Sequence, residues 1–248
     1  WHWRGETLQI RLDPLNPWRA ELDLKGKQKV SFVDQRGVRQ DIDGKAKSAR
    51  GVVEFYADGK WSSGTADIRS LQLTSVQVEK PLTIDKVTFS GKSGEMLTLS
   101  TQLAGVALPI VAGPVLGEGI ELLRLDLSLS NPLPTGWTRS DVRGWRDDGG
   151  VVEIARARLK WGTLDLTVAG TLALDAALRP QASGTAKLRG HAEVIAAYRE
   201  NGMITAMNAA ALTIALNVLG RDADGAVNIP VTVQEGRLKV GPMEIARL

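Results

Sequence analysis

The sequence predicts a mainly β protein of the α+β class, built on one large, curved antiparallel sheet that forms a half-pipe or a barrel-like structure. Three observations lead to this prediction. Apolar and polar residues alternate along most of the chain, turn signals separate the alternating runs, and one uncharged, alanine-rich segment favours helix. With 248 residues and 43% hydrophobic content, the chain can bury a core without disulfides.

The strands are predicted from alternation with a period of two residues. Between positions 123 and 130, leucines alternate with Arg124, Asp126, Ser128 and Ser130, and positions 163–168 and 171–175 follow the same rule. Such strands have one apolar and one polar face, as antiparallel sheets do, whereas parallel strands covered on both faces would read as continuous apolar runs. Tight turns are predicted at Asx-Gly and Glu-Gly pairs, including Asp58-Gly59, Asp224-Gly225 and Glu235-Gly236.

Two helices are predicted near 192–219 and are expected to pack on the sheet. Gly202 separates a shorter helix at Ala192–Asn201 from a longer one at Met203–Leu219, which has no charged residue. Its length would allow a membrane span. Four polar residues favour a helix buried against the sheet instead; they are Thr205, Asn208, Thr213 and Asn217.

The domain organisation is predicted from a change in composition. Residues 1–102 form an N-terminal β half and residues 121–248 a C-terminal α+β half. The segment 103–120 between them is apolar but interrupted by Pro109, Gly113, Pro114, Gly117 and Gly119, so it is expected to be a loop. One continuous domain is the alternative.

Motifs for catalysis, metals and cofactors are missing from the sequence. There is no cysteine, and neither His2 nor His191 has a second ligand at metal spacing. The loop Gly91-Lys92-Ser93 lacks the upstream glycine of a phosphate-binding loop, and the Asp41 and Asp222 turns lack later calcium ligands. We therefore expect no enzyme activity, no metal and no cofactor.

Charge and aromatic content argue against nucleic acid as a partner. The net charge is only +3, and aromatic residues make up 5% of the chain, which leaves few platforms for base stacking. Lys25, Lys27 and Lys29 recur with period 2, so we expect them to line one face of a strand. We interpret that face as solvated, with contact to lipid headgroups as the alternative.

A mismatch between apolar surface and its cover predicts a ligand groove. Many strands present an aliphatic face, yet only two helices are available to cover it. Either the sheet covers itself, or it stays open and exposes a hydrophobic groove. The predicted lining consists of leucine, isoleucine and valine side chains: Leu108, Ile110, Val111, Val115, Leu116, Leu125, Leu127, Leu164, Leu166 and Leu174. The segment Leu108–Leu116 is the candidate mouth or membrane-docking element.

Four stretches carry a family resemblance: WRDDGG at 145–150, LKWG at 159–162, GTLALDAALRP at 170–180 and VQEGRLKVGP at 233–242. In this order, they resemble an uncharacterised family of Gram-negative, alphaproteobacterial-type envelope proteins with an N-terminal membrane anchor and a periplasmic body. The resemblance covers Glu121–Leu248, and a looser similarity links the chain to AsmA-like lipid-handling proteins. Within these stretches, Asp175 and Arg179 are placed to pair across a hairpin bend.

The resemblance implies a periplasmic location, with anchoring to the inner membrane by a segment that precedes Trp1. Our first hypothesis is a protein that binds or helps transport a lipid or other hydrophobic molecule and contacts a membrane surface. The alternative is an envelope scaffold or assembly factor with a protein partner. A hydrolase with unrecognised catalytic residues is the third hypothesis.

Overall fold

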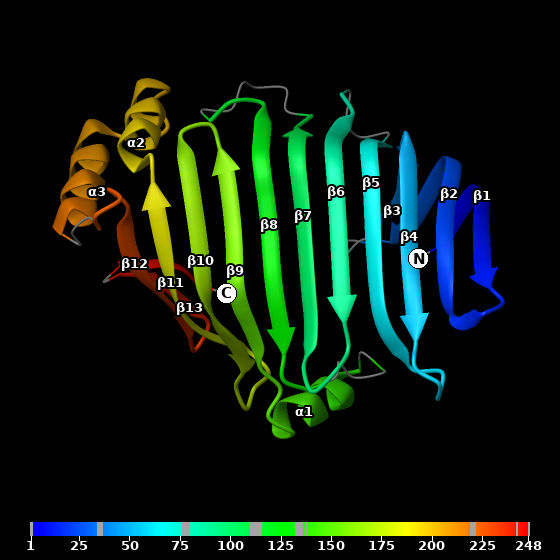
Figure 1. The fold of residues 1–248 in the computed structure, drawn as a ribbon. Coiled ribbons are helices and arrows are strands. Elements are labelled where there is room, and N and C mark those ends of the chain that lie inside the picture. Colours follow the sequence, from blue (N-terminus) through cyan, green and yellow to red (C-terminus); the bar gives the residue numbers. More distant parts are fainter. Residues whose placement is uncertain are drawn as a thin grey trace. The chain divides into compact units, whose positions relative to one another are not determined.

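The computed structural model describes residues 2–33, 37–75, 80–109, 116–131, 136, 138–218, 222–241 and 243–247. These residues form 14 strands and three helices, and every ladder described between two strands is antiparallel (Figure 1). The predicted fold class, mainly β with an antiparallel sheet, is confirmed. The chain divides into two compact units: Trp1–Ser93 with Ser100–Leu123, and Gly94–Leu99 with Arg124–Leu248.

The strands of the first unit follow the order β1-β2-β3-β5-β6. Another strand, β4, also pairs with β2 and β5. β3 and β4 follow one another along β2, because β2 pairs with β4 through positions 19–24 and with β3 through positions 27–33. The strands of this unit are β1 (His2–Asp13), β2 (Asn16–Val33), β3 (Arg39–Lys45), β4 (Ser48–Phe55), β5 (Trp61–Ser75) and β6 (Leu82–Lys92).

A bulge in β2 changes which lysines share a face. Gly5 pairs with Gln28 and Thr7 pairs with Lys25, so β2 gains one residue around Gly26, whose φ is +76°. Lys25 therefore lies on the face of Gln9 and donates from Nζ to Gln9 Oε1 at 2.9 Å. Lys29 lies on the other face and pairs with Asp41 at 3.1 Å. The prediction that Lys25, Lys27 and Lys29 line one face is wrong, because alternation continues only through a regular strand.

The second unit contains three helices and most of the remaining strands, while β7 and β8 contribute residues to both units. From β9 to β14 each strand pairs with the next along the chain. The elements are β7 (Leu97–Ala107), β8 (Gly119–Leu129), α1 (Arg139–Asp147), β9 (Val152–Trp161), β10 (Leu164–Leu174), β11 (Pro180–Arg189), α2 (His191–Glu200), α3 (Ala206–Val218), β12 (Val227–Gln234), β13 (Arg237–Val240) and β14 (Met243–Arg247).

The core of the second unit lies on the apolar face of β10 to β12. Ala186, Val227 and Ile229 are buried there, and Leu216 of α3 packs against them. The other side chains packed on this cluster are Leu166, Val168, Leu188, Val231 and Val240. The hairpin between β10 and β11 closes through Asp175, whose carboxylate accepts from Arg179 Nε at 2.7 Å, as the sequence predicted.

The two predicted helices near 192–219 are present, and one helix was missed. α1 begins with a capping box between Thr138 and Asp141. It is held to the β10–β11 turn by Arg146, whose Nη1 donates to the carbonyl oxygens of Asp175 and Ala176 at 3.1 and 2.9 Å. The sequence concealed α1 because it is nine residues long and contains Gly144.

Two details of the prediction need correction. The segment 103–120 is not all loop, because β7 continues through Ala107 and β8 begins at Gly119. The longer helix, α3, is not buried against the sheet on all sides. Leu216 packs on the core, but Met207, Ile214 and Val218 are 64–80% exposed on its outer side.

Candidate apolar ligand site

Along β4, between β2 and β5, the sheet of the first unit has one apolar and one polar face, and its register fixes which residues share each face. Leu22, Gly51, Ala66 and Phe89 lie opposite one another on β2, β4, β5 and β6. The adjacent row on the same face consists of Leu24, Ala49, Ile68 and Val87. Because side chains alternate between faces, the residues between these rows point to the other side of the sheet.

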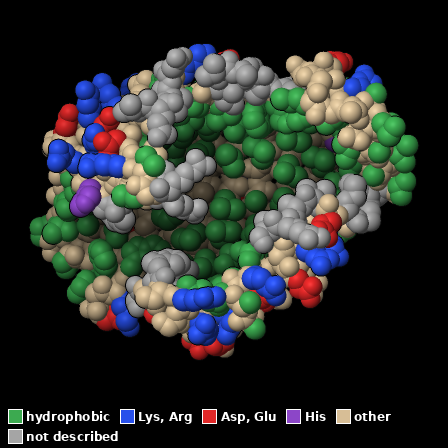
Figure 2. Space-filling view, turned by 180° about the vertical axis from the view of Figure 1, so that it is seen from behind, with side chains coloured by type: hydrophobic (Ala, Val, Ile, Leu, Met, Phe, Trp, Pro, Cys, Tyr) green, Lys and Arg blue, Asp and Glu red, His purple; other side chains and the backbone are tan. Residues whose placement is uncertain are grey.

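A trough of about 260 Å³ lies on the apolar face. Its floor is formed by residues with little or no side chain: Gly51, Gly64 and Ala66. Large side chains surround the floor: Leu22, Leu24, Val53, Trp61, Ile68 and Phe89. In Figure 2, which looks onto this face, hydrophobic side chains gather over the strands and charged ones lie at the margin.

The indole of Trp61 lies over the floor at Gly64, within van der Waals contact of a Cβ placed there. A Cβ atom placed on Gly64 would lie 3.4 Å from Trp61 Nε1 and 3.6 Å from its Cζ2. A Cβ on Gly51 would lie 3.1 Å from the carbonyl oxygen of Thr65. The depth of the trough therefore follows from glycine at two positions on neighbouring strands.

The apolar face continues onto the edge strand β1. Ile10 lies opposite Leu22 and Leu8 lies opposite Leu24. Leu8, Ile10 and Leu12 are 44%, 59% and 61% exposed, which is high for consecutive aliphatic residues on one face of a strand. The hydrophobic surface is thus wider than the trough itself.

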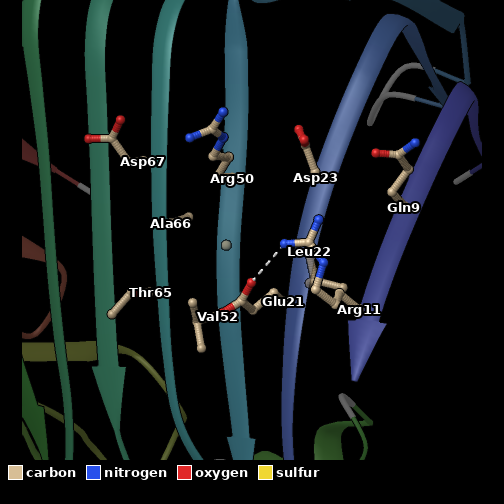
Figure 3. A pocket seen from close by; sticks show the side chains of 11 residues that line it. Gln9, Arg11, Glu21, Leu22, Asp23, Arg50, Val52, Thr65, Ala66 and Asp67 are labelled. Carbon is tan, nitrogen blue, oxygen red and sulfur yellow. Dashed lines mark hydrogen bonds and ion pairs between the residues drawn. The ribbon is translucent and has the colours of Figure 1, made fainter. Parts of the chain in front are cut away.

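The opposite face carries a larger but polar pocket of about 540 Å³ (Figure 3). Gln9, Asp23, Arg50 and Asp67 form one row across β1, β2, β4 and β5, and Arg11, Glu21, Val52 and Thr65 form the next. The side chain of Arg50 belongs to this face, although its backbone borders the trough.

The carboxylates of the polar pocket are engaged in ion pairs. Arg69 pairs with Asp67 at 3.0 Å and Lys86 approaches it at 3.7 Å, while Glu21 pairs with Arg11 at 3.4 Å. The hydrogen bond from Arg69 lowers the pKa of Asp67, with a smaller Coulombic contribution from Lys86. The polar pocket thus presents paired charges to a ligand, whereas the trough on the other face presents apolar side chains.

The residues predicted to line a groove fall at several places. Leu125 and Leu127 are half-buried on β8, and Leu164, Leu166 and Leu174 are half-buried on β10, where Leu166 packs on the core. Leu108 and Leu116 are also half-buried, whereas Ile110, Val111 and Val115 lie outside the described residues. None of the seven that the structure describes lines the trough of the first unit.

The sequence alone did not predict the trough, because the trough arises from the alignment of two strands and not from a local sequence motif. Val52, Thr65 and Asp67 alternate with Gly51, Gly64, Ala66 and Ile68, and the small residues become a floor only when β4 and β5 are aligned. The sequence left the N-terminal half without a role for this reason.

The described ranges contain no group of three or more His, Asp or Glu side chains placed to hold a metal ion. None of the described helices is long and apolar enough to cross a membrane.

Comparison with known proteins gives one match. A family model described as "Uncharacterized protein conserved in bacteria (DUF2125)" matches residues 1–248, so the similarity extends well beyond the half, Glu121–Leu248, on which the resemblance was based. No curated protein matches significantly. No solved structure does either.

Proposed function

The chain belongs to this bacterial family, DUF2125, and from the geometry of its first unit we propose that it binds a lipid or another hydrophobic molecule without chemically changing it. The observation that carries the proposal is the open, apolar trough on β2, β4, β5 and β6. Its floor and surrounding side chains offer no charge on that face, so they would contact a hydrocarbon chain more favourably than water.

The dimensions of the trough favour one acyl chain over a compact ligand. A volume of about 260 Å³ falls just below the roughly 300–1,000 Å³ of sites that enclose drug-sized molecules. An extended chain would lie in the trough and continue over Leu8, Ile10 and Leu12. Each methylene removed from water contributes about 0.8 kcal/mol, so six buried methylenes supply about 5 kcal/mol before the costs of binding are subtracted.

The first test is chemical. Protein purified without detergent is extracted with organic solvent, and the extract is compared by mass spectrometry with a mock purification. We expect a lipid in near-stoichiometric amount, or saturable uptake of a fluorescent acyl probe by protein that has lost its ligand. Background lipid together with no probe uptake would contradict the proposal.

A pair of neighbouring substitutions tests whether the trough is the site. Ala66→Asp puts a charge on the trough floor, and Thr65→Asp puts the same charge on the opposite face of the same strand. We expect Ala66→Asp to weaken acyl-probe binding at least tenfold and Thr65→Asp to change it less than twofold. Circular dichroism confirms that both variants fold, and equal effects of the two would place the ligand elsewhere.

The location proposed for this activity is the periplasm, with attachment to the inner membrane. It is supported by the resemblance to anchored envelope proteins, and by the fact that acyl chains are abundant beside a membrane. Fractionation of cells that produce the tagged full-length protein tests it. Recovery in the cytosolic fraction would contradict it.

A second function, as an envelope scaffold, is favoured by the edge strand β1. In the described residues β1 pairs only with β2, it contains no proline or lysine, and it presents exposed Leu8, Ile10 and Leu12. A protein partner could add a strand to this edge. Arg11→Pro, at a position whose side chain lies on the other face of β1, should disturb such an addition, and loss of a cross-linked partner without loss of probe binding would favour the scaffold.

A further inference from the structure

A stripe of exposed hydrophobic side chains runs along the outer side of α3, in the second unit. Met207, Ile214 and Val218 follow the helical spacing i, i+7, i+11, which places them within about 40° of one another around the helix axis. They are 80%, 64% and 80% exposed, and Met203, just before the helix, is 63% exposed. We call Met207, Ile214 and Val218 the outer stripe.

The opposite side of α3 is already occupied. Ala209 is buried, and Leu216 packs on the core formed by Ala186, Val227 and Ile229. A helix that is apolar on all sides is normally buried on all sides, in a core or in a membrane. The described part of this unit covers only one side of α3, so the outer stripe calls for a second apolar environment.

Two hydroxyl groups at α3 are already hydrogen-bonded within the chain, and the helix carries no charge. The helix has no charged residue among its thirteen. The hydroxyl of Thr213 donates to the carbonyl oxygen of Ala209 at 2.8 Å, and the hydroxyl of Thr205 accepts from the backbone N–H of Asn208 at 3.2 Å. These hydroxyls have partners within the chain, so leaving water does not cost them a hydrogen bond.

The area of the exposed side of α3 indicates whether a second protein copy or a lipid surface covers it. A thirteen-residue helix is about 20 Å long and 10 Å wide, so one side offers on the order of 200 Å². A stable interface between two protein copies needs about 800 Å² from each, which α3 alone does not supply. Transfer of apolar side chains into lipid has no such threshold, because its free energy scales with the area removed from water.

We propose that α3 docks the protein on the surface of a lipid bilayer, with Met207, Ile214 and Val218 inserted among the acyl chains and the sheet held above them. The helix is too short to cross the membrane and lies along it. Docking is hydrophobic rather than electrostatic, because the helix itself carries no cation. This inference does not depend on the trough, which lies in the other unit.

A site-directed fluorophore gives the most direct test, because the chain contains no cysteine. Single cysteines are introduced as Met207→Cys, Ile214→Cys and, as controls, Asn208→Cys and Asp58→Cys, and each is labelled with an environment-sensitive NBD group. With phosphatidylcholine vesicles, we expect a blue shift and at least a twofold intensity rise at 207 and 214. We expect smaller changes at 208, about 100° around the helix, and none at 58.

Vesicle flotation tests the energetic role of the stripe. Met207→Asp combined with Ile214→Asp should reduce co-flotation with phosphatidylcholine vesicles at least fivefold, in low and in high salt. Asn208→Asp is the matched control, because it adds the same charge near the helix N-terminus but beside the outer stripe. It should reduce co-flotation less than twofold. Acyl-probe binding by the double variant should equal that of the wild type, which separates this proposal from the trough.

Three outcomes would overturn the docking proposal. One is the absence of any fluorescence change at 207 and 214 with vesicles. Another is binding that requires anionic lipid and disappears in high salt, which would point to the lysine-bearing strands. The third is a concentration-dependent blue shift without vesicles, which would identify a second copy of the chain as the occupant.

Discussion

At the scale of single residues, two facing glycines let β10 and β11 approach each other closely. Gly170 pairs with Gly184 across the ladder. A Cβ on Gly170 would collide with the carbonyl oxygen of Ser183 and lie 2.7 Å from the Cα of Gly184. Since these neighbours are backbone atoms, no side-chain rotation could relieve the contact, and the pair is required by packing rather than by a positive φ.

The glycine pair gives the first prediction. Gly170→Ala should destabilise the protein by about 1–3 kcal/mol, because the extra methyl overpacks the ladder. Gly144→Ala is the control, since a Cβ there meets nothing within 4 Å and alanine favours the helix by about 0.5–1 kcal/mol. Urea unfolding measures both, and equal stabilities for the two variants would contradict the prediction.

A second residue-scale feature is the bidentate ion pair between β9 and β10. Arg158 donates from Nε to Asp165 Oδ1 at 3.0 Å and from Nη2 to Oδ2 at 2.7 Å. The side chains are 38% and 18% exposed. Hydrogen bonding from Arg158 lowers the pKa of Asp165, with a smaller Coulombic contribution from the same residue.

The sign of the pH dependence follows from that lowered pKa. The pair stabilises the fold above the ordinary aspartate pKa, and the stabilisation disappears as pH falls through the lowered value. Asp165→Asn should therefore cost about 1 kcal/mol at pH 7, allowing for solvent screening, and less at pH 2. Urea unfolding at both values checks this, and a loss that stays constant with pH would show that the pair is not its cause.

At the scale of elements, α1 shows how a short helix is stabilised by its ends. Thr138 Oγ1 accepts from the backbone N–H of Asp141 at 3.3 Å, and the Asp141 carboxylate accepts from the backbone N–H of Thr138 at 2.9 Å. Arg146 in the last turn then ties the helix to the hairpin of Asp175. A helix of nine residues would be marginal without these contacts.

The cap of α1 gives an element-scale prediction. Thr138→Ala removes the side-chain acceptor and should lower the free energy of unfolding by about 1 kcal/mol, whereas Thr138→Ser should retain most of it. Hydrogen exchange of the amides at 141–143 should accelerate in the alanine variant alone. Equal exchange in the two variants would mean that Arg146, rather than the cap, holds α1.

At the scale of the whole molecule, both units leave large apolar side chains exposed. They include Leu8, Ile10 and Leu12 in the first unit and Met207, Ile214 and Val218 in the second. The few fully buried hydrophobic residues are distributed over both units. Much of the aliphatic surface of the strands is therefore available for a ligand or a lipid surface, in agreement with both proposals.

Acid stability is predicted at the same scale. Several aspartates have lowered pKa values: the hydrogen bond from Lys187 lowers that of Asp222 to about 2, and hydrogen bonds from neighbouring groups lower those of Asp165, Asp175 and Asp67. Because these groups bind fewer protons when folded than when unfolded, stability should rise with pH between about 2 and 4. Urea midpoints should stay level from pH 7 to 5 and fall below pH 4. A steep fall already between pH 7 and 5 would contradict this.

The family resemblance was recognised only in the second unit, and local sequence patterns predicted only contacts between residues close together in the chain. The four stretches that carried the resemblance lie at 145–150, 159–162, 170–180 and 233–242, all in the second unit, whereas the family model covers 1–248. Asp175 and Arg179, three residues of loop apart, pair as predicted because the turn brings them together locally. Residues far apart in the sequence, such as Leu22 and Phe89, carried no such local signal.

Periodicity and turn chemistry within a few residues were enough to predict the fold class, the antiparallel pairing and the helices near 192–219. The facing of small residues, such as Gly51 and Ala66 in the trough, became visible only in the folded chain. The same holds for the bulge at Gly26, which separates Lys25 from Lys29, and for the exposure of the outer stripe of α3. Alternation assigns a residue to a face, but register, bulges and neighbouring elements determine what that face contacts.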